Sequence, residues 1–297
     1  MRVVVVGCGS IGRRHARNLL ALGCEVVATD RDPGVILHPE WPEAVTFAKQ
    51  WWEDGPFDAE IIATPAAVRF SVIPHSARPI FIEKPLAADV WSARTIAQWC
   101  APRTVTQVGY MLRWHPAIQR IQQLLLSDAI GSPIHARFYS GSDLTTWGGR
   151  AYGSALTECS HEIDIALHLL GPATCTAARS CRQEGWWELW LQHESGAMST
   201  VALNYVQKDY YRGVQIVGST GSIYWDWASP SVTVDRGRDG LEDYEAPLAD
   251  VNDLYLAELA DFLACVRSGE PTRVPLQAGV DVLEICESAQ ALAAKAA

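Results

Sequence analysis

Residues 1–23 read MRVVVVGCGSIGRRHARNLLALG, and this stretch decides the fold. The β-branched run at 3–6 is typical of a short strand that is buried on both faces. Three glycines interrupt this run, apolar residues then recur at helical spacing over 10–22, and Gly23 ends the helix. Residues 25–29 have the pattern of a second strand. The stretch therefore predicts a strand–turn–helix–strand unit with a right-handed crossover.

The same alternation of strands and helices continues through residue 108. We expect further strands at 60–63, 78–82 and 104–108, and a helix at 89–100 with Asp89 as its N-cap. Repeated units of this kind are typical of a parallel, doubly wound sheet with helices on both faces. Residues 1–115 are therefore predicted to form a dinucleotide-binding Rossmann domain of the α/β class.

The pattern changes near residue 115, where strand-like runs begin to follow one another closely. We expect strands at 134–140, 186–193, 199–206, 214–217, 222–225 and 231–235, separated by glycine-rich turns. Helical patterns occur at 117–126, 160–170, 254–266 and 277–296. Residues 116–297 are therefore predicted to form an α+β domain for the substrate, with an antiparallel sheet that helices cover on one face.

Composition and charge exclude several classes of protein. Apolar residues make up 48% of the 297 residues, which is enough for a sizeable core. The net charge of -10, without a basic stripe, argues against nucleic acid as a partner. No apolar run reaches the length of about 18 residues that a membrane span needs. The eight cysteines are scattered without a CxxC pair, which favours reduced thiols and a cytoplasmic protein.

The three glycines fit the spacing GxGxxG of dinucleotide-binding turns. Gly7 would allow the tight turn, Gly9 would let the backbone approach a pyrophosphate, and Gly12 would let the helix pack closely on the strand. Asp30 lies at the end of the second strand, where it would accept hydrogen bonds from ribose hydroxyls and favour NAD. The neighbouring Arg31 could instead pair with a 2′-phosphate, so NADP stays possible. The alternative is a purely structural glycine turn.

A second cluster, FIEKPL at 81–86, places Glu83 and Lys84 at the carboxyl end of an expected strand. In an open α/β sheet, that edge faces the ligand crevice. A lysine flanked by apolar residues there should be partly desolvated, and it could stabilise an alkoxide or polarise a carbonyl. The alternative is a surface ion pair that involves Glu83, with a solvated Lys84.

The third cluster, ECSHEIDIALH at 158–168, is expected to be helical from Ser160 onward. A helix there places His161, Asp164 and His168 along one face. Histidine has the pKa range needed to take a hydroxyl proton. The alternatives are a packing or capping histidine, and a metal site with His161 and Asp164 as ligands. No convincing third ligand is present, so we expect no metal.

Together these clusters resemble the glucose–fructose oxidoreductase and inositol dehydrogenase family. The resemblance rests on GCGSIGRRHARNL in the first turn and helix, IATP at 62–65, EKPLA at 83–87, GYMLRWHP at 109–116 and HEIDIALHLLG at 161–171. These motifs follow the family's order and spacing over nearly the whole chain. The resemblance implies a Rossmann domain, then a domain with a large open antiparallel sheet that mediates homodimers or homotetramers.

The resemblance also implies hydride transfer between nicotinamide and a carbon of a sugar, sugar nucleotide or cyclitol. Lys84 would contact the substrate and the nicotinamide ribose, and His161 would be the acid/base, with Glu158 as a third catalytic group. The residues expected to contact the cofactor are Gly7, Gly9, Ser10, Ile11, Gly12, Asp30, Arg31, Thr64, Pro65, Glu83 and Lys84. The residues expected to contact the substrate are Lys84, Arg113, His161 and Asp164.

Three positions depart from the pattern of the family. Many relatives have aspartate four residues before the histidine, where this chain has Thr157 with Glu158 beside it. Relatives often have histidine in place of Arg69 and asparagine in place of Met111. These changes lie near the expected pocket, so the substrate is expected to differ from the familiar ones. The segment WGGRAY at 147–152 is a candidate flap, with an ordinary surface loop as the alternative.

The sequence thus predicts a cytoplasmic NAD(P)-dependent oxidoreductase that acts on a polyhydroxylated small molecule. Two other functions stay open. The chain could be a nucleotide-sensing Rossmann protein without turnover, or an imine or carbonyl reductase built on the same scaffold. The fold alone does not separate these three functions.

Overall fold

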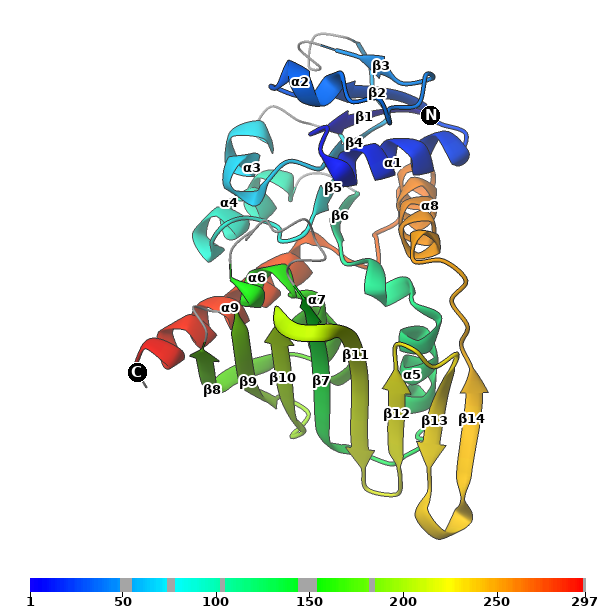
Figure 1. Ribbon diagram of the computed structural model, residues 1–297, viewed down its shortest axis with the longest axis vertical. Helices are drawn as coiled ribbons and strands as arrows, with labels where there is room; N and C mark the ends of the chain where they lie inside the picture. The colour runs from blue at the N-terminus through cyan, green and yellow to red at the C-terminus, as the bar shows by residue number, and fades with distance from the viewer. Residues whose placement is uncertain (49–54, 74–77, 102–104, 144–153, 182–184, 296–297) are drawn as a thin grey trace. The chain divides into compact units, whose positions relative to one another are not determined.

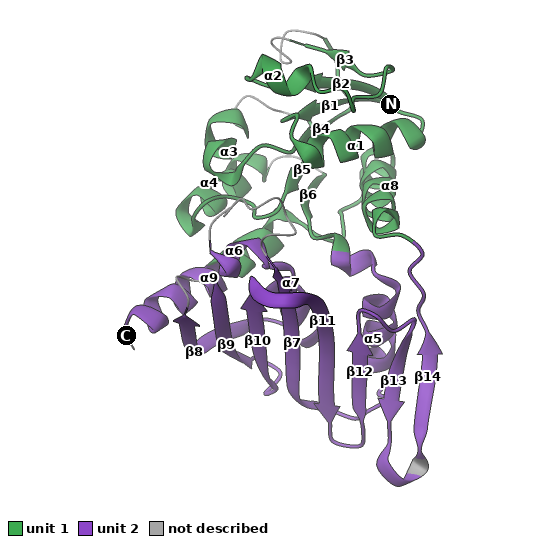
Figure 2. Ribbon diagram, in the orientation of Figure 1, with its two compact units in different colours: residues 1–111, 250–283 green, residues 112–249, 284–297 purple. Residues whose placement is uncertain are grey.

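The computed structural model describes residues 1–48, 55–73, 78–101, 105–143, 154–181 and 185–295 (Figure 1). The chain divides into two compact units, coloured separately in Figure 2. Unit 1 comprises residues 1–111 and 250–283, and unit 2 comprises residues 112–249 and 284–297. This division differs from the predicted domains 1–115 and 116–297, because the chain returns to unit 1 near its end.

Unit 1 contains a parallel sheet, sheet A, formed by six of the described strands. These strands are β1 (Arg2–Val6), β2 (Glu25–Thr29), β3 (Thr46–Phe47), β4 (Ala59–Ile62), β5 (Ile80–Glu83) and β6 (Thr106–Gly109). Their order in the sheet is β3-β2-β1-β4-β5-β6, and every pair is parallel. This order confirms the predicted doubly wound Rossmann sheet, in which ligands bind where the strand order reverses, beside β1 and β4.

The described helices of unit 1 include one that the sequence assigned to the other domain. They are α1 (Ser10–Ala21), α2 (Pro33–Ile36), α3 (Ala66–Val72), α4 (Val90–Cys100) and α8 (Asn252–Ser268). Asp89 caps α4 as predicted, by accepting a hydrogen bond from the N–H of Ser92 at 2.8 Å. Helix α8 packs against α1, and its Leu259 and Phe262 are fully buried in the core cluster that also contains Val3. Burial of this apolar face explains why α8 belongs to unit 1.

The glycine turn joins β1 to α1 with almost no space between them. A Cβ on Gly12 would lie 1.9 Å from the carbonyl oxygen of Gly7. Gly7 has a φ of +102°, and a Cβ there would lie 2.7 Å from the backbone of Ala63. Gly9 differs from both, because nothing lies within 4 Å of its Cβ position. Two of the three glycines are thus required by packing within the protein, and Gly9 is not.

Unit 2 contains sheet B, to which eight of the described strands contribute. These strands are β7 (Pro133–Asp143), β8 (Ala173–Cys181), β9 (Trp186–His193), β10 (Met198–Asn204), β11 (Val206–Gly218), β12 (Ser222–Asp226), β13 (Ser231–Asp235) and β14 (Leu241–Glu245). Their order is β14-β13-β12-β11-β7-β10-β9-β8. Neighbouring strands are antiparallel except β7 and β10, which are parallel, so the predicted antiparallel sheet is in fact mixed.

Helices of unit 2 pack on one face of sheet B, as predicted. Helix α7 (His161–Leu170) contacts β7 and β10, α5 (Pro116–Leu126) contacts β13, and α6 (Ala155–Glu158) contacts β9 and β10. In β13, Val232 and Val234 are buried while Thr233 between them lines a surface cavity, as the pleat of a strand requires. Helix α9 (Leu276–Lys295) begins in unit 1 and ends in unit 2.

Two strands of sheet B lack a clear signal in the sequence. β8 is rich in small residues, and β14, LEDYE, is a charged and largely exposed edge strand. Neither has the β-branched, alternating pattern that identifies a half-buried strand. None of the helices that the structure describes is both long and apolar enough to cross a membrane.

The contrast between Gly12 and Gly9 gives a prediction about stability. Gly12→Ala should lower the free energy of unfolding by roughly 3 kcal/mol or more, because the added methyl group would overlap a backbone oxygen. Gly9→Ala should leave it unchanged or raise it by about 0.5 kcal/mol, because its φ of -65° suits alanine and its surroundings are open. Denaturant unfolding of both variants measures the difference, and equal stabilities would contradict the packing described here.

Candidate functional site

The turn between β1 and α1 presents backbone N–H groups at the edge of sheet A. Helix α1 begins at Ser10, and none of the described side chains caps it at Gly9. The N–H groups of its first turn, which include those of Ser10 and Ile11, therefore have no partner within the helix. Such a helix start carries a partial positive charge and suits an anion such as a pyrophosphate.

Asp30 follows β2 and accepts a hydrogen bond from the glycine turn. Its Oδ2 accepts a hydrogen bond from the N–H of Cys8 at 2.7 Å, and its Oδ1 accepts one from the N–H of Asp32 at 2.9 Å. Each carboxylate oxygen can accept a second hydrogen bond, so ribose hydroxyls can still bind there. The neighbouring Arg31 is exposed.

Two further observations test whether the residues of this edge fit a dinucleotide. Nothing within 4 Å occupies the Cβ position of Gly9, and such open space would let a pyrophosphate approach the backbone closely. The hydroxyl of Thr64, at the end of β4, is buried and has no hydrogen-bond partner among the described residues. Pro65 next to it is exposed at the start of α3. These features fit the predicted cofactor contacts.

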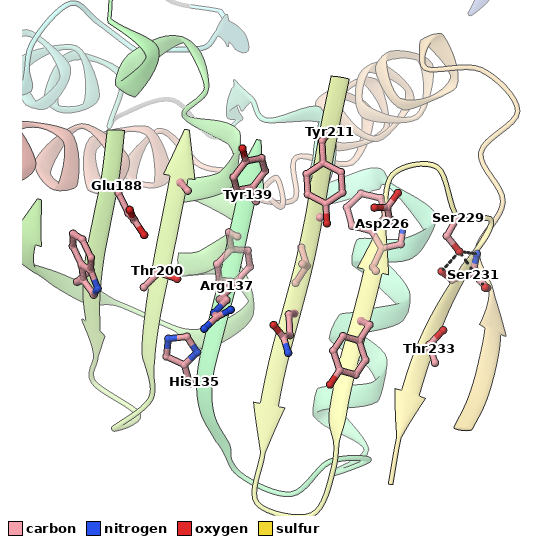
Figure 3. Close-up of a pocket in the computed structure, with 18 of the residues that line it drawn as sticks. His135, Arg137, Tyr139, Glu188, Thr200, Tyr211, Asp226, Ser229, Ser231 and Thr233 are labelled. Carbon is pink, nitrogen blue, oxygen red and sulfur yellow. Dashed lines mark hydrogen bonds between the residues drawn. The ribbon is translucent and has the colours of Figure 1, made fainter. Parts of the chain in front are cut away.

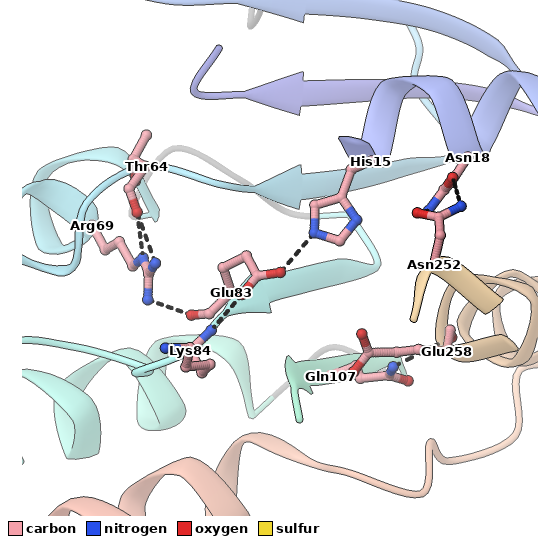
Figure 4. Close-up of polar contacts among 9 residues, drawn as sticks. All are labelled: His15, Asn18, Thr64, Arg69, Glu83, Lys84, Gln107, Asn252 and Glu258. Atoms are coloured by element: carbon pink, nitrogen blue, oxygen red, sulfur yellow. Dashed lines mark hydrogen bonds and ion pairs between the residues drawn. The ribbon is translucent and has the colours of Figure 1, made fainter. Parts of the chain in front are cut away.

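The end of β5 carries Glu83 and Lys84, and Figure 4 shows the polar contacts around them. Glu83 is buried, its Oε1 lies 2.7 Å from Nε2 of His15, and its Oε2 accepts a hydrogen bond from the N–H of Lys84 at 3.0 Å. Lys84 is half-buried, as predicted from its apolar neighbours. Burial alone would raise the pKa of Glu83. The hydrogen bond from His15 and the charges of Lys84 and Arg69 outweigh burial and lower that pKa.

Arg69 is buried and forms hydrogen bonds with main-chain carbonyl groups at the carboxyl ends of both β4 and β5. Its Nε and Nη2 donate to the carbonyl oxygen of Thr64, at 2.9 and 2.7 Å. Its Nη1 donates to the carbonyl oxygens of Glu83 and Pro85. The arginine that departs from the family pattern thus binds main-chain carbonyl groups in the interior of unit 1.

In unit 2, His161 lies in the first turn of α7 and is 8% exposed. Asp164, one turn later, forms a bidentate ion pair with Arg113. Nε of Arg113 donates to Oδ2 of Asp164 at 2.9 Å, and Nη2 of Arg113 donates to Oδ1 at 2.6 Å. Burial raises the pKa of Asp164, and the Arg113 guanidinium offsets only part of this shift. Two of the four residues predicted to contact substrate therefore contact each other in the structure.

Other groups around α7 are held by their neighbours. Glu162 is buried and forms an ion pair with Arg212 at 2.6 Å. His168 has a pKa lowered to about 4, by burial first and then by the charge of Arg113, which keeps it neutral near pH 7. Glu158 ends α6 and is half-buried, and Thr157 uses its hydroxyl to donate to the carbonyl oxygen of Ser154.

The predicted site residues divide between the two units. The glycine turn, Asp30, Thr64 and Lys84 belong to unit 1, whereas Arg113, Glu158, His161 and Asp164 belong to unit 2. The approach of Lys84 to His161 stays a prediction. The candidate flap at 147–152 lies outside the described residues. No group of three metal-binding side chains occurs in the ranges that the structure describes.

The sequence analysis did not single out His15, which contacts Glu83, and it identified Arg69 only as a departure from the family pattern. The signal for His15 was available, because it lies three residues after Gly12, on the helix face that packs against the strand. The contacts of Arg69 with three carbonyl groups depend on tertiary structure, and no local sequence pattern predicts them.

A cavity of about 950 Å³ lies on the outer face of sheet B, opposite the helices (Figure 3). Its lining includes Trp190, Tyr211 and Tyr224, which are 37–40% exposed, and the charged Arg137 and Glu188. None of the predicted catalytic, cofactor or substrate residues lines it. This cavity is therefore distinct from the candidate site.

Comparisons with known proteins agree with this architecture. A sequence model described as "Oxidoreductase family, C-terminal alpha/beta domain" matches residues 135–295, which is more than half of the chain. Among characterised proteins, scyllo-inositol 2-dehydrogenase (NAD(+)) of Bacillus subtilis is 25% identical, over 95% of this chain and 90% of its own length.

Solved structures resemble the whole chain. An oxidoreductase from Agrobacterium radiobacter, in complex with NAD+, L-tartaric acid and magnesium, has a TM-score of 0.89 at 22% identity and covers 100% of this chain and 97% of its own. UDP-N-acetylglucosamine 3-dehydrogenase from Acidithiobacillus ferrooxidans has a TM-score of 0.84 at 20% identity and covers 99% and 98%. At such identities the likeness establishes the fold.

The family match and the fold agree with the motifs of the glycine turn, of β5 and of α7. This chain belongs to the glucose–fructose oxidoreductase and inositol dehydrogenase family of oxidoreductases.

Proposed function

We propose that this protein is an NAD-dependent dehydrogenase that transfers hydride between nicotinamide and a hydroxyl-bearing carbon of a sugar, sugar nucleotide or cyclitol. The observation that carries the proposal is the edge of sheet A. There the open space at Gly9 and a buried Thr64 hydroxyl, which has no partner among the described residues, lie on the same edge as Lys84. The names of the relatives, which act on inositols and a sugar nucleotide, support the substrate class.

The residues of the chain divide the chemistry as follows. The cofactor, when bound, supplies the hydride acceptor. In the oxidation direction, His161 accepts the proton of the reacting hydroxyl as a general base. Lys84 stabilises the negative charge that develops on the same oxygen. Glu158 is the proposed partner that completes the catalytic set in place of the aspartate common in relatives. Arg113 and Asp164, bound to each other, are proposed to present the substrate-binding surface of α7.

The test of the function is turnover by the purified protein. We expect reduced nicotinamide to appear when the protein is incubated with NAD and a panel of inositols, aldoses and sugar nucleotides. Binding of NADH without turnover on any substrate would favour a nucleotide sensor. Reduction confined to imines or simple carbonyl compounds would favour a reductase. Either result would overturn the proposal.

The catalytic roles predict a large loss of kcat in two variants. Lys84→Met and His161→Asn should each lower kcat by about 10²-fold or more, the usual scale for a positioned acid–base or charge-stabilising group. The affinity for NADH should fall much less than kcat, because the contacts of the glycine turn remain in both variants. Lys208→Met is the matched control, because Lys208 is exposed and paired with Asp143. Wild-type kcat in Lys84→Met would contradict the assigned role.

The position of Asp30 predicts a preference for NAD over NADP. Its carboxylate would repel a 2′-phosphate, so NADH should bind more tightly than NADPH. Asp30→Asn keeps an oxygen for the Cys8 N–H but removes the charge. It should therefore lower the ratio of the Kd for NADPH to the Kd for NADH about tenfold or more. Asp32→Asn, on the exposed N-cap of α2, is the control. Fluorescence titration measures both affinities, and equal affinities in the wild type would refute the preference.

We further propose that the chain forms a homodimer or homotetramer through the outer face of sheet B. The exposed aromatic residues around the cavity, with opposite charges among them, support a self-complementary interface. Tyr224→Glu should shift the mass in light scattering to that of a monomer. Leu126→Glu, at the 81% exposed end of α5 on the helix side, should not. A monomeric wild-type protein would contradict the proposal.

The cytoplasmic location predicted from the sequence stays a prediction.

A further inference from the structure

We propose that His15 is a positioning residue for Lys84, and that it acts through the carboxylate of Glu83. The inference rests on the proposed function only in so far as Lys84 is the group that stabilises charge on the substrate oxygen. It adds a role for His15, and it assigns to Glu83 a task within the protein instead of contact with the cofactor.

The contacts form an unbroken series from α1 to the end of β5 (Figure 4). Nε2 of His15 lies 2.7 Å from Oε1 of Glu83. The second oxygen, Oε2, accepts the backbone N–H of Lys84 at 3.0 Å. The Glu83 carboxylate therefore turns back onto the chain and binds the residue that follows it. This contact fixes the peptide plane from which the Lys84 side chain starts.

The Glu83 carboxylate is closely packed by its surroundings. A Cβ on Gly109, the partner of Glu83 in β6, would lie 3.2 Å from both the carboxyl carbon and Oε2. Only glycine leaves ordinary space there for the carboxylate. The imidazole of His15 is fully buried and meets the ring of Phe81 edge-on, with centroids 5.3 Å apart. Both partners of the hydrogen bond are therefore buried and packed against neighbouring residues.

Charge explains why these residue types are present. The lowered pKa of Glu83 means that its carboxylate is ionised near neutral pH, so Nε2 of His15 must carry the proton and donate it. A buried carboxylate without this donor would be costly, and it would turn toward another one. The Lys84 N–H would then lose its acceptor. Arg69, which binds the carbonyl oxygens on either side of Lys84, holds the same segment from the opposite direction.

A purely structural ion pair is the competing explanation, and the same sheet offers a control. Glu60, in β4, is fully buried and pairs with Arg78 at 2.8 Å, before β5 begins. This pair lies at the amino ends of the strands, away from the edge that carries Lys84. Loss of the Glu60 charge should affect stability alone. Loss of the His15 donor should affect Lys84 as well.

The experiment compares His15→Leu, His15→Gln and Glu60→Gln with the wild type. Leucine removes the donor, whereas the amide nitrogen of glutamine can replace Nε2. We expect His15→Leu to lower kcat about tenfold to a hundredfold, with the Kd for NADH changed by less than about twofold. His15→Gln should recover most of the lost kcat. Glu60→Gln should lower the Tm and leave kcat unchanged.

A second readout does not need turnover. The chain has four lysines, Lys49, Lys84, Lys208 and Lys295, so ¹⁵N-lysine labelling gives a simple amide spectrum that Lys84→Arg assigns. In the wild type, the Lys84 amide should exchange slowly with solvent because it donates to a buried carboxylate. His15→Leu should shift this signal and speed its exchange, whereas Glu60→Gln should do neither.

The outcomes separate the inference from the proposed function. A wild-type protein without turnover, whose Lys84 amide nevertheless responds to His15→Leu, would overturn the proposed function and keep the link between His15 and Lys84. An unchanged Lys84 amide in His15→Leu would overturn the inference, whatever the activity. So would a loss of kcat, NADH affinity and Tm together, without recovery in His15→Gln, because it would indicate only a structural role.

Discussion

Helix α1 lies so close to β1 that the Cβ of any other residue at Gly12 would sit 1.9 Å from the carbonyl oxygen of Gly7. This contact fixes the helix against the sheet, and the rest of unit 1 follows from it. Because helix positions three apart share a face, the helix that packs at Gly12 also directs His15 toward the sheet. There His15 meets Glu83 at 2.7 Å. The close approach of α1 to β1 thus positions both the N–H groups of the glycine turn and the His15 side chain that contacts Glu83.

The charged side chains buried in this region are bound by one another or by the main chain. Glu83, His15 and Arg69 bind one another or the main chain, and they lie in the interior of unit 1. Within the described residues, the hydroxyl of Thr64 and Nδ1 of His15 are buried and have no hydrogen-bond partner. An unsatisfied buried hydroxyl costs free energy, and the proposed cofactor would supply a partner for the Thr64 hydroxyl.

The sequence predicted the Rossmann sheet well because its strands are short, apolar and followed by strong helix signals, as in residues 1–29. It did not predict that α8 packs on α1, because the pattern of an amphipathic helix does not identify the apolar surface that the helix covers. It predicted the positions of Lys84 and His161 but not their surroundings. The pairing of Arg113 with Asp164 joins residues 51 positions apart, and the role of His15 joins residues 68 positions apart. Such contacts exist only after folding.

In each unit the proposed reactive residue is next in the chain to a buried, ion-paired carboxylate. Lys84 follows Glu83, whose carboxylate is bound by His15 from another element, and His161 precedes Glu162, whose carboxylate is bound by Arg212 from β11. A buried ion pair contributes little net stability, because the cost of desolvating both charges offsets most of their attraction. In unit 1 the pair also holds the main chain beside it, because the Glu83 carboxylate accepts the N–H of Lys84. This contact positions the proposed reactive lysine through its main-chain N–H and not through its side chain.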